Sequence, residues 1–136
     1  MAIENPSVFP LGEPNTGYAQ YFVGQSYLAP LVGGPDKEVS VANVTFEPGC
    51  RNNWHIHHGV CQILIAVGGR GYYQEWGKEP QELNPGDVVY VAPGTKHWHG
   101  AAPDSAFSHI AIMNTAEGAS NEWLEPVDAD DYNTLA

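Results

Sequence analysis

Residues Gly49 to Gly69 read GCRNNWHIHHGVCQILIAVGG and hold the densest group of potential metal ligands in this chain. His55 and His57 stand two positions apart, so on a β-strand both imidazoles project from the same face. Gln62 follows with a side-chain carbonyl oxygen, and the run GTKHWHG far downstream supplies another imidazole at His97. Three imidazoles and an oxygen donor suit one divalent transition metal.

The sequence around these residues has the pattern of turns and short strands that is typical of an all-β protein. Turn residues recur roughly every ten positions and no long helical period is present. The strand Val39–Phe46 has two unlike faces, and Gln62–Val67 is apolar. Further strands are expected over residues 54–58, 71–76, 87–91, 96–100 and 106–113. This pattern alone predicts an all-β sandwich or barrel.

The spacing of glycines and histidines resembles the first motif of the cupin family. Gly49, His55, His57 and Gly69 stand at the motif's positions, and Gln62 stands where the motif has a glutamate. A glutamine keeps the full divalent charge on the metal, which strengthens Lewis acidity and weakens affinity for Mg²⁺ or Ca²⁺. The alternative is that Gln62 does not bind and that the site holds three histidines or no metal.

The second cupin motif is matched in part. Gly86, Gly94 and His97 fit its spacing, while Ala92 and Ala101 replace the proline and asparagine of the motif. The resemblance implies an all-β fold, the cupin jelly roll, in which two antiparallel sheets close into a small barrel.

The resemblance divides the chain into three parts. We expect residues 1–38 to form an N-terminal arm on the barrel or on a partner subunit, residues 39–113 the cupin barrel, and residues 114–136 a C-terminal tail with room for one helical turn. Tyr18–Val32 is too apolar for a free arm, so we expect it on an outer sheet face or at a subunit interface. Because cupins commonly dimerise through such a face, the resemblance favours a homodimer.

Composition limits the partners of this 136-residue chain. It carries 5 Lys and Arg against 16 Asp and Glu, a formal charge of −11, which argues against nucleic acids and anionic membranes. No apolar run approaches the roughly 20 residues of a membrane span, and no secretory signal is visible. Cys50 and Cys61 indicate free thiols in a reducing cytoplasm, with thiolate ligation as the alternative.

A narrower resemblance concerns the metal site. The residues from Trp54 to Gln62 and the HWH run are similar to single-domain cupins associated with carboxymuconolactone decarboxylases, and to the manganese-dependent hydroxynitrile lyases of cupin fold. This resemblance implies His55, His57, Gln62 and His97 as ligands and favours manganese, while the residues alone suit Mn, Fe, Ni or Zn. The lyases have one residue fewer before the glutamine, and a glutamine in place of Met113.

Two more histidines are candidates for catalysis. His99 lies two positions after His97 and shares its face, so it is placed to act as a general acid or base. His109 is placed to line the same cavity from the last strand. A hydrogen-bonded structural histidine is the alternative for each. The rest of the cavity wall is expected from Ala42, Val44, Ala101 and Met113.

Three functions remain open on these residues. The first is a metal-dependent lyase acting on a small oxygenated molecule, with the metal as Lewis acid and His99 moving a proton. The second is a metal-dependent dioxygenase, because three histidines and an open coordination position also suit O₂ chemistry. The third is a cupin that binds a small molecule without catalysis.

Overall fold

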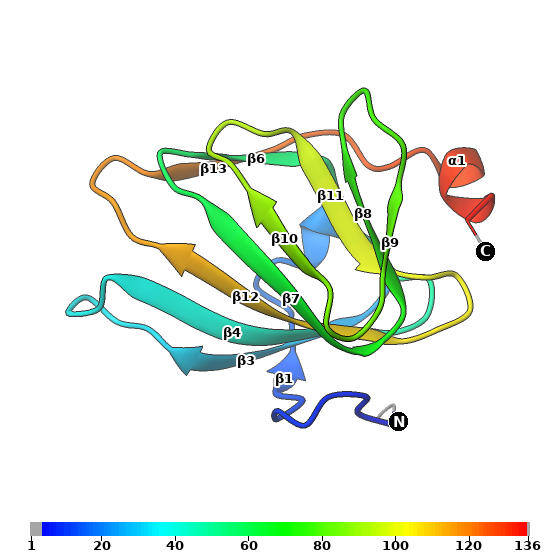
Figure 1. The fold of residues 1–136 in the computed structure, drawn as a ribbon, viewed down its shortest axis with the longest axis horizontal. Helices are drawn as coiled ribbons and strands as arrows, with labels where there is room; N and C mark the ends of the chain where they lie inside the picture. Colours follow the sequence, from blue (N-terminus) through cyan, green and yellow to red (C-terminus); the bar gives the residue numbers. More distant parts are fainter. Residues whose placement is uncertain (1–3, 136) are drawn as a thin grey trace.

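The computed structural model describes residues 4–135, and its regular secondary structure is almost wholly β-strand. One sheet, sheet A, has six antiparallel strands in the order β1-β3-β4-β12-β7-β10 (Figure 1). Its strands are β1 (Glu13–Pro14), β3 (Ser26–Val32), β4 (Val39–Phe46), β12 (Phe107–Asn114), β7 (Gln62–Gly69) and β10 (Val88–Val91).

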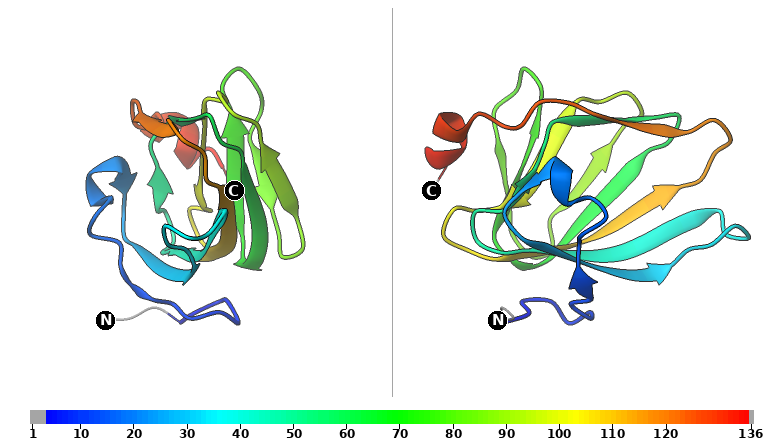
Figure 2. Two further views of the ribbon diagram at one scale, coloured as in Figure 1. Left: turned by 90° about the vertical axis from the view of Figure 1, so that its left-hand side faces the viewer. Right: turned by 180° about the vertical axis from the view of Figure 1, so that it is seen from behind.

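The second sheet, sheet B, has seven strands and lies against the first across the interior (Figure 2). Its path runs β13-β6-β11-β5-β2, and β8 pairs with both β11 and β9. Its strands are β2 (Phe22–Val23), β5 (Arg51–Asn52), β6 (His55–His58), β8 (Gly71–Glu75), β9 (Gln81–Leu83), β11 (His97–Ala101) and β13 (Ser120–Trp123). A 3-10 turn, η1 (Ala19–Tyr21), and a short helix, α1 (Ala129–Asn133), complete the fold. This is the jelly roll that the cupin motifs predict.

The interior is divided between apolar side chains and histidines. An apolar cluster fills much of the barrel, and it consists of Phe46, Cys50, Leu64, Ala66, Tyr73, Leu83, Val89, Val91, Ala101 and Phe107. Strand β7 shows how the sequence selects this arrangement, since Gln62, Leu64 and Ala66 are buried on one face while Ile63 and Ile65 are only half-buried on the other. Gln62 therefore enters the interior together with the apolar residues of its strand.

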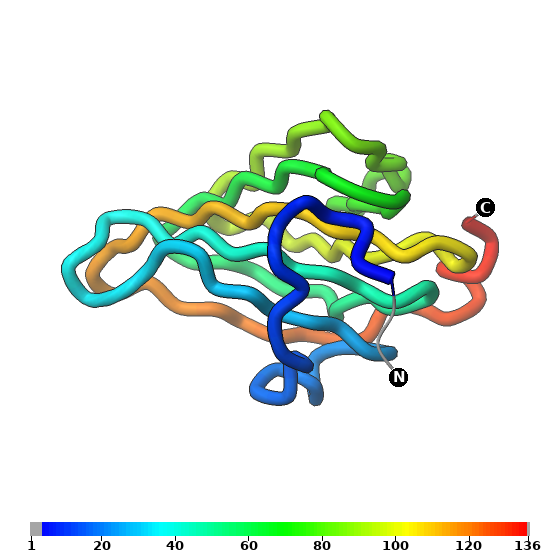
Figure 3. Tube along the Cα trace, turned by 90° about the horizontal axis from the view of Figure 1, so that it is seen from below, coloured from blue at the N-terminus to red at the C-terminus, as the bar shows by residue number. Residues whose placement is uncertain are grey.

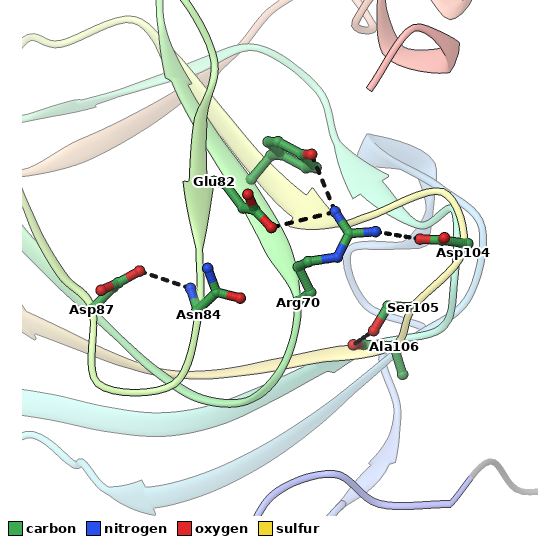
Figure 4. Close-up of polar contacts among 8 residues, drawn as sticks. Arg70, Glu82, Asn84, Asp87, Asp104, Ser105 and Ala106 are labelled. Atoms are coloured by element: carbon green, nitrogen blue, oxygen red, sulfur yellow. Dashed lines mark hydrogen bonds and ion pairs between the residues drawn. The ribbon is translucent and has the colours of Figure 1, made fainter. Parts of the chain in front are cut away.

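The turn between β7 and β8 packs closely against the backbone of Ala106, just before β12. Gly69 has a φ of 70°, and a Cβ atom there would lie 1.9 Å from the carbonyl oxygen of Ala106, so only glycine fits. The backbone N–H of Arg70 donates to that same carbonyl at 3.1 Å. The Arg70 guanidinium pairs with Asp104 and, at 3.5 Å, with Glu82 (Figure 4).

The N-terminal segment crosses the outer face of sheet A (Figure 3). Ser7 donates a hydrogen bond to the side-chain oxygen of Asn43 at 3.0 Å, and the Asn43 amide donates to the carbonyl of Pro10 at 3.1 Å. Thr45 and Ser108 share a hydrogen bond of 2.7 Å on the same face. The segment thus adds two hydrogen bonds to the buried amide of Asn43, which also donates to Thr45 at 3.2 Å.

Hydrogen-bonded strands extend beyond the range 39–113 that we expect for the barrel. Strands β1, β2 and β3 come from the part before residue 39, and β13 comes from the part after residue 113. The division into arm, barrel and tail stays a prediction, and its residues 1–3 and 136 lie outside the described range. Within residues 4–135, no helix is long and apolar enough to cross a membrane.

Candidate metal centre

Three buried histidines converge inside sheet B. His55 and His57 lie on β6, and His97 on the adjacent strand β11 is paired directly with His55. One ring nitrogen from each can be chosen so that all three lie within 4.8 Å of one another. The strand alternation that places His55 and His57 on one face therefore produces the expected cluster.

The hydrogen bonds of two histidines fix which ring nitrogen can bind a metal. Nδ1 of His55 lies 2.7 Å from the carbonyl oxygen of Asn53, and Nδ1 of His97 lies 2.9 Å from that of Thr95. A carbonyl oxygen only accepts, so each Nδ1 carries the proton and each Nε2 keeps its lone pair. Nε2 of His97 is buried and has no hydrogen-bond partner among residues 4–135.

His57 and Gln62 complete the set of donors. Nδ1 of His57 lies 2.7 Å from the side-chain oxygen of Asn121, and a proton on this Nδ1 leaves the Nε2 lone pair free. That Nε2 lies 3.1 Å from Oε1 of Gln62. Two lone-pair atoms facing each other at this distance repel unless a cation lies between them. The two atoms are close enough to bind one ion together.

The geometry and protonation of this cluster fit a divalent transition metal. One ring nitrogen from each of His55, His57 and His97 lies within 4.8 Å of the others, so small side-chain shifts bring all three to the roughly 2.0–2.1 Å at which imidazoles bind such an ion. Burial, followed by repulsion from His97, lowers the pKa of His55 well below its usual value. Burial likewise lowers the pKa of His97 to about 4. Both rings are therefore neutral near pH 7, the form that coordinates metals.

A second pair of histidines adjoins the cluster. The rings of His99 and His109 lie 4.9 Å apart and nearly perpendicular, and both residues are buried. Burial lowers the pKa of His109 to about 4, and neither of its ring nitrogens has a hydrogen-bond partner among the described residues. His109 is thus a neutral imidazole that has a lone pair available.

The strand register places the expected wall residues. Ala42 lies opposite Ala111, and Val44 lies opposite His109, so both are beside the second histidine pair. Met113 is paired with Gln62 across β12 and β7. Ala101 has no exposed surface and belongs to the apolar cluster of the interior. Ala42 and Val44 thus lie on the same face of sheet A as His109.

A cavity of about 250 Å³ opens beside the metal cluster. Two of its lining residues are neighbours of the cluster: Met113 is paired with Gln62 across β12 and β7, and Asn121 is hydrogen-bonded to His57. Its lining has no ionisable side chain and consists of Ser40, Val60, Met113, Asn114, Thr115, Ala116, Ala119, Ser120 and Asn121. A molecule that enters this cavity therefore meets no charged side chain in its lining.

The structure adds residues that sequence reasoning missed. Asn121 and Trp123 lie on β13, and the Trp123 ring is 4.7 Å from the ring of His55. Asn52 on β5 contacts His99 through two hydrogen bonds. Asn52 could have been suspected because it lies in Gly49–Gly69 together with His55 and His57. The four-residue strand β13 has too little apolar alternation to be distinguished from an irregular tail.

Neither cysteine joins the metal cluster, and both are free thiols. Cys50 packs in the apolar cluster, where burial raises the pKa of its thiol to about 12. The Cys61 thiol donates to the side-chain oxygen of Asn114 at 3.3 Å. Strand alternation turns Cys61 away from the face of Gln62.

Comparison with known proteins agrees with the fold and the site. Residues 42–113, more than half of the chain, match the family described as the cupin domain. The chain is a cupin. It is 44% identical over 117 residues to the (R)-mandelonitrile lyase of Granulicella tundricola, a match that covers 85% of this chain and 88% of the relative.

Solved structures give the same family. A cupin-like protein from Thermotoga maritima superposes with a TM-score of 0.87 at 37% identity, covering 96% of this cupin and 97% of the other chain. A predicted oxalate decarboxylase from the same organism superposes with a TM-score of 0.68 over 76% of this chain and 93% of its own. Because the latter is only 19% identical, it supports the shared fold alone.

Proposed function

We propose that this cupin is a metal-dependent lyase that cleaves a small, uncharged oxygenated molecule, with a cyanohydrin as the substrate class. The observation that carries the proposal is the buried ligand set, in which the lone pairs of His55, His57 and His97 and the oxygen of Gln62 converge. The 44% identity to an (R)-mandelonitrile lyase supports the substrate class. Manganese is the proposed metal, by resemblance to the cupin hydroxynitrile lyases.

Cyanohydrin cleavage requires one proton transfer and one bond cleavage. The hydroxyl loses its proton, the bond between the carbinol carbon and the nitrile carbon breaks, and the products are an aldehyde and hydrogen cyanide. A divalent ion, when bound, supplies Lewis acidity toward a substrate oxygen or toward the departing anion. His55, His57, Gln62 and His97 hold that ion with neutral ligands only, which preserves its charge.

The neighbouring residues supply the proton chemistry. His109 is neutral and its ring nitrogens have no partner among the described residues, so it can accept the hydroxyl proton and return it to cyanide. Ala42 and Val44 form an apolar wall beside it, which excludes water and strengthens local electrostatic effects. The uncharged lining of the adjoining cavity suits a neutral cyanohydrin and its neutral products.

The test is cleavage of mandelonitrile by purified protein, before and after EDTA treatment and after addition of Mn²⁺. We expect benzaldehyde and cyanide to form only with the metal, with one enantiomer consumed faster. A matched control is H58Q, because His58 adjoins the ligand His57 but is exposed and pairs with Glu122. Absence of cleavage by the manganese-loaded protein, or equal cleavage after metal removal, would refute the proposal.

Oxygen consumption separates this proposal from a dioxygenase. The iron-loaded protein is incubated with mandelonitrile and with enediol or aromatic substrates in an oxygen electrode. We expect no substrate-dependent consumption. Consumption at a rate above that of the H55A/H57A double variant would favour the dioxygenase.

A further inference from the structure

The side chain of Asn52 forms two hydrogen bonds with His99. Asn52 is the last residue of β5 and is buried, as is His99 on β11. The backbone N–H of His99 donates to Oδ1 of Asn52 at 3.0 Å. The amide nitrogen of the same Asn52 lies 3.1 Å from Nε2 of His99.

The first of these hydrogen bonds determines the direction of the second. A backbone N–H can only donate, so the atom of Asn52 that faces it must be the amide oxygen. The amide NH₂ therefore faces the imidazole, and because this group only donates, Nε2 of His99 must accept. A neutral imidazole carries a single N–H, which is then on Nδ1.

We propose that Asn52 is a positioning residue that holds His99 in the Nδ1–H tautomer, so that His99 acts in the barrel interior as a hydrogen-bond donor and not as a base. The lone pair of the ring is occupied by the Asn52 amide. Nδ1 of His99 is buried and has no hydrogen-bond partner among residues 4–135, so its proton is available to a water or a substrate atom. A buried donor without a partner is unfavourable, and a bound acceptor would relieve that cost.

This assignment gives His99 and His109 different roles in catalysis, and it rests on the proposed lyase function. His99 and His109 have ring centroids 4.9 Å apart, so one small molecule can contact both. His109 accepts the hydroxyl proton, while the Nδ1–H of His99 donates a hydrogen bond to the departing cyanide or to the new carbonyl oxygen. Leaving-group stabilisation by a fixed donor lowers the barrier without a second proton transfer.

The tautomer can be measured directly by long-range ¹H–¹⁵N spectra of protein labelled with ¹⁵N-histidine and loaded with diamagnetic Zn²⁺. Comparison with H99F assigns the His99 signals. We expect the wild-type spectrum to show a protonated Nδ1 and an unprotonated Nε2. A protonated Nε2 in the wild-type protein would overturn the proposal without any variant.

Two substitutions test the role of Asn52. In N52D the carboxylate can only accept, so Nε2 of His99 becomes protonated, whereas N52L leaves both tautomers populated. N84D is the control, because it adds the same charge in the exposed turn between β9 and β10 and should leave the His99 tautomer unchanged. An Nδ1–H pattern that persists in both N52D and N52L would show that Asn52 does not set the tautomer.

Kinetics adds a second readout. If cyanohydrins are cleaved, N52D should lower kcat by about tenfold or more while KM changes much less, because the donor acts on the departing group. Equal kcat in N52D and wild type would reject the donor role of His99. Failure of the wild-type protein to cleave cyanohydrins would reject the proposed function alone, since the spectra test the tautomer independently.

Discussion

Nδ1 of His57 and Oδ1 of Asn121 lie 2.7 Å apart, although the two residues are 64 positions apart in the sequence. Strand β13 brings them together, because it pairs antiparallel with β6 and places Asn121 directly opposite His57. Residues after the barrel range 39–113 therefore contact the histidine cluster. In a metal site built on this cluster, the Asn121 amide would orient the His57 ring and hold its proton on Nδ1.

Replacing Asn121 by leucine should weaken metal binding. Loss of such an orienting partner typically costs 10–100-fold in metal affinity, so we expect about that increase in the dissociation constant of N121L. Competition with a fluorescent chelator measures it. The matched control is E122Q on the same strand, whose partner His58 is exposed and not a ligand. Equal affinities in N121L and E122Q would contradict this role.

The double variant H55A/H57A should lose the metal altogether. Two of the three convergent imidazoles disappear, and the remaining His97 and Gln62 are too few to compete with water for a divalent ion. Elemental analysis of protein purified without added metal should give about one transition-metal ion per wild-type chain and none in the variant. H58A should keep the ion. Wild-type stoichiometry in H55A/H57A would place the site elsewhere.

The sequence predicted the fold and the histidine cluster because both depend on short-range patterns. His55 and His57 share a strand, and strand alternation alone sets their common face. The partners of the ligands could not be read in the same way. Asn121 reaches His57 only through the pairing of β13 with β6, and the polar strand β13 carries little apolar alternation to predict that pairing.

The position of Ala101 shows that the sequence did not predict how far the cavity extends. Alternation correctly places Ala101 on the face of His97 and His99. It cannot tell how far along the barrel the cavity extends, because that depends on which side chains from sheet A fill the space. Phe46 and Phe107 do so, and Ala101 packs with them in the apolar cluster.

Because His109 is buried in its neutral form, the free energy of unfolding should fall as the pH is lowered. The pKa of His109 is about 4 in the folded protein because of burial, against 6.5 for an unperturbed histidine. Below pH 6.5 the unfolded chain binds the proton first, so stability is fully present above that pH and declines as the pH falls toward 4. The loss amounts to about 2–3 kcal/mol by pH 4.5.

Urea unfolding in EDTA measures this effect as a difference between variants. Between about pH 7 and pH 4.5, the free energy of unfolding of wild type should fall by about 2–3 kcal/mol more than that of H109L, which cannot bind the proton. H58Q should behave like wild type, because His58 is exposed. Parallel pH profiles for wild type and H109L would show that His109 titrates normally in the folded protein.

A homodimer remains the expected assembly, and the structure suggests which face would form it. An apolar row crosses the outer face of sheet A from strand to strand in register, and it consists of Val32, Val41, Ile112, Ile63 and Tyr90. Val32 lies at the end of the Tyr18–Val32 segment, and Tyr90 is 61% exposed on the edge strand β10. A second copy can cover this row by presenting the same row, as in a two-fold interface.

Light scattering tests the dimer. Burial of apolar area at roughly 25 cal/mol per Å² favours association, and the repulsion from the net charge is screened beyond about 8 Å at physiological salt. We expect the mass of two chains at micromolar concentration, and a monomer for the double variant V32K/Y90K, because burying two unpaired lysines per chain opposes the contact. V23K is the control, since Val23 is about as exposed as Val32 but lies on β2 of sheet B. A wild-type monomer would reject the dimer, and a V32K/Y90K dimer would move the interface to another face.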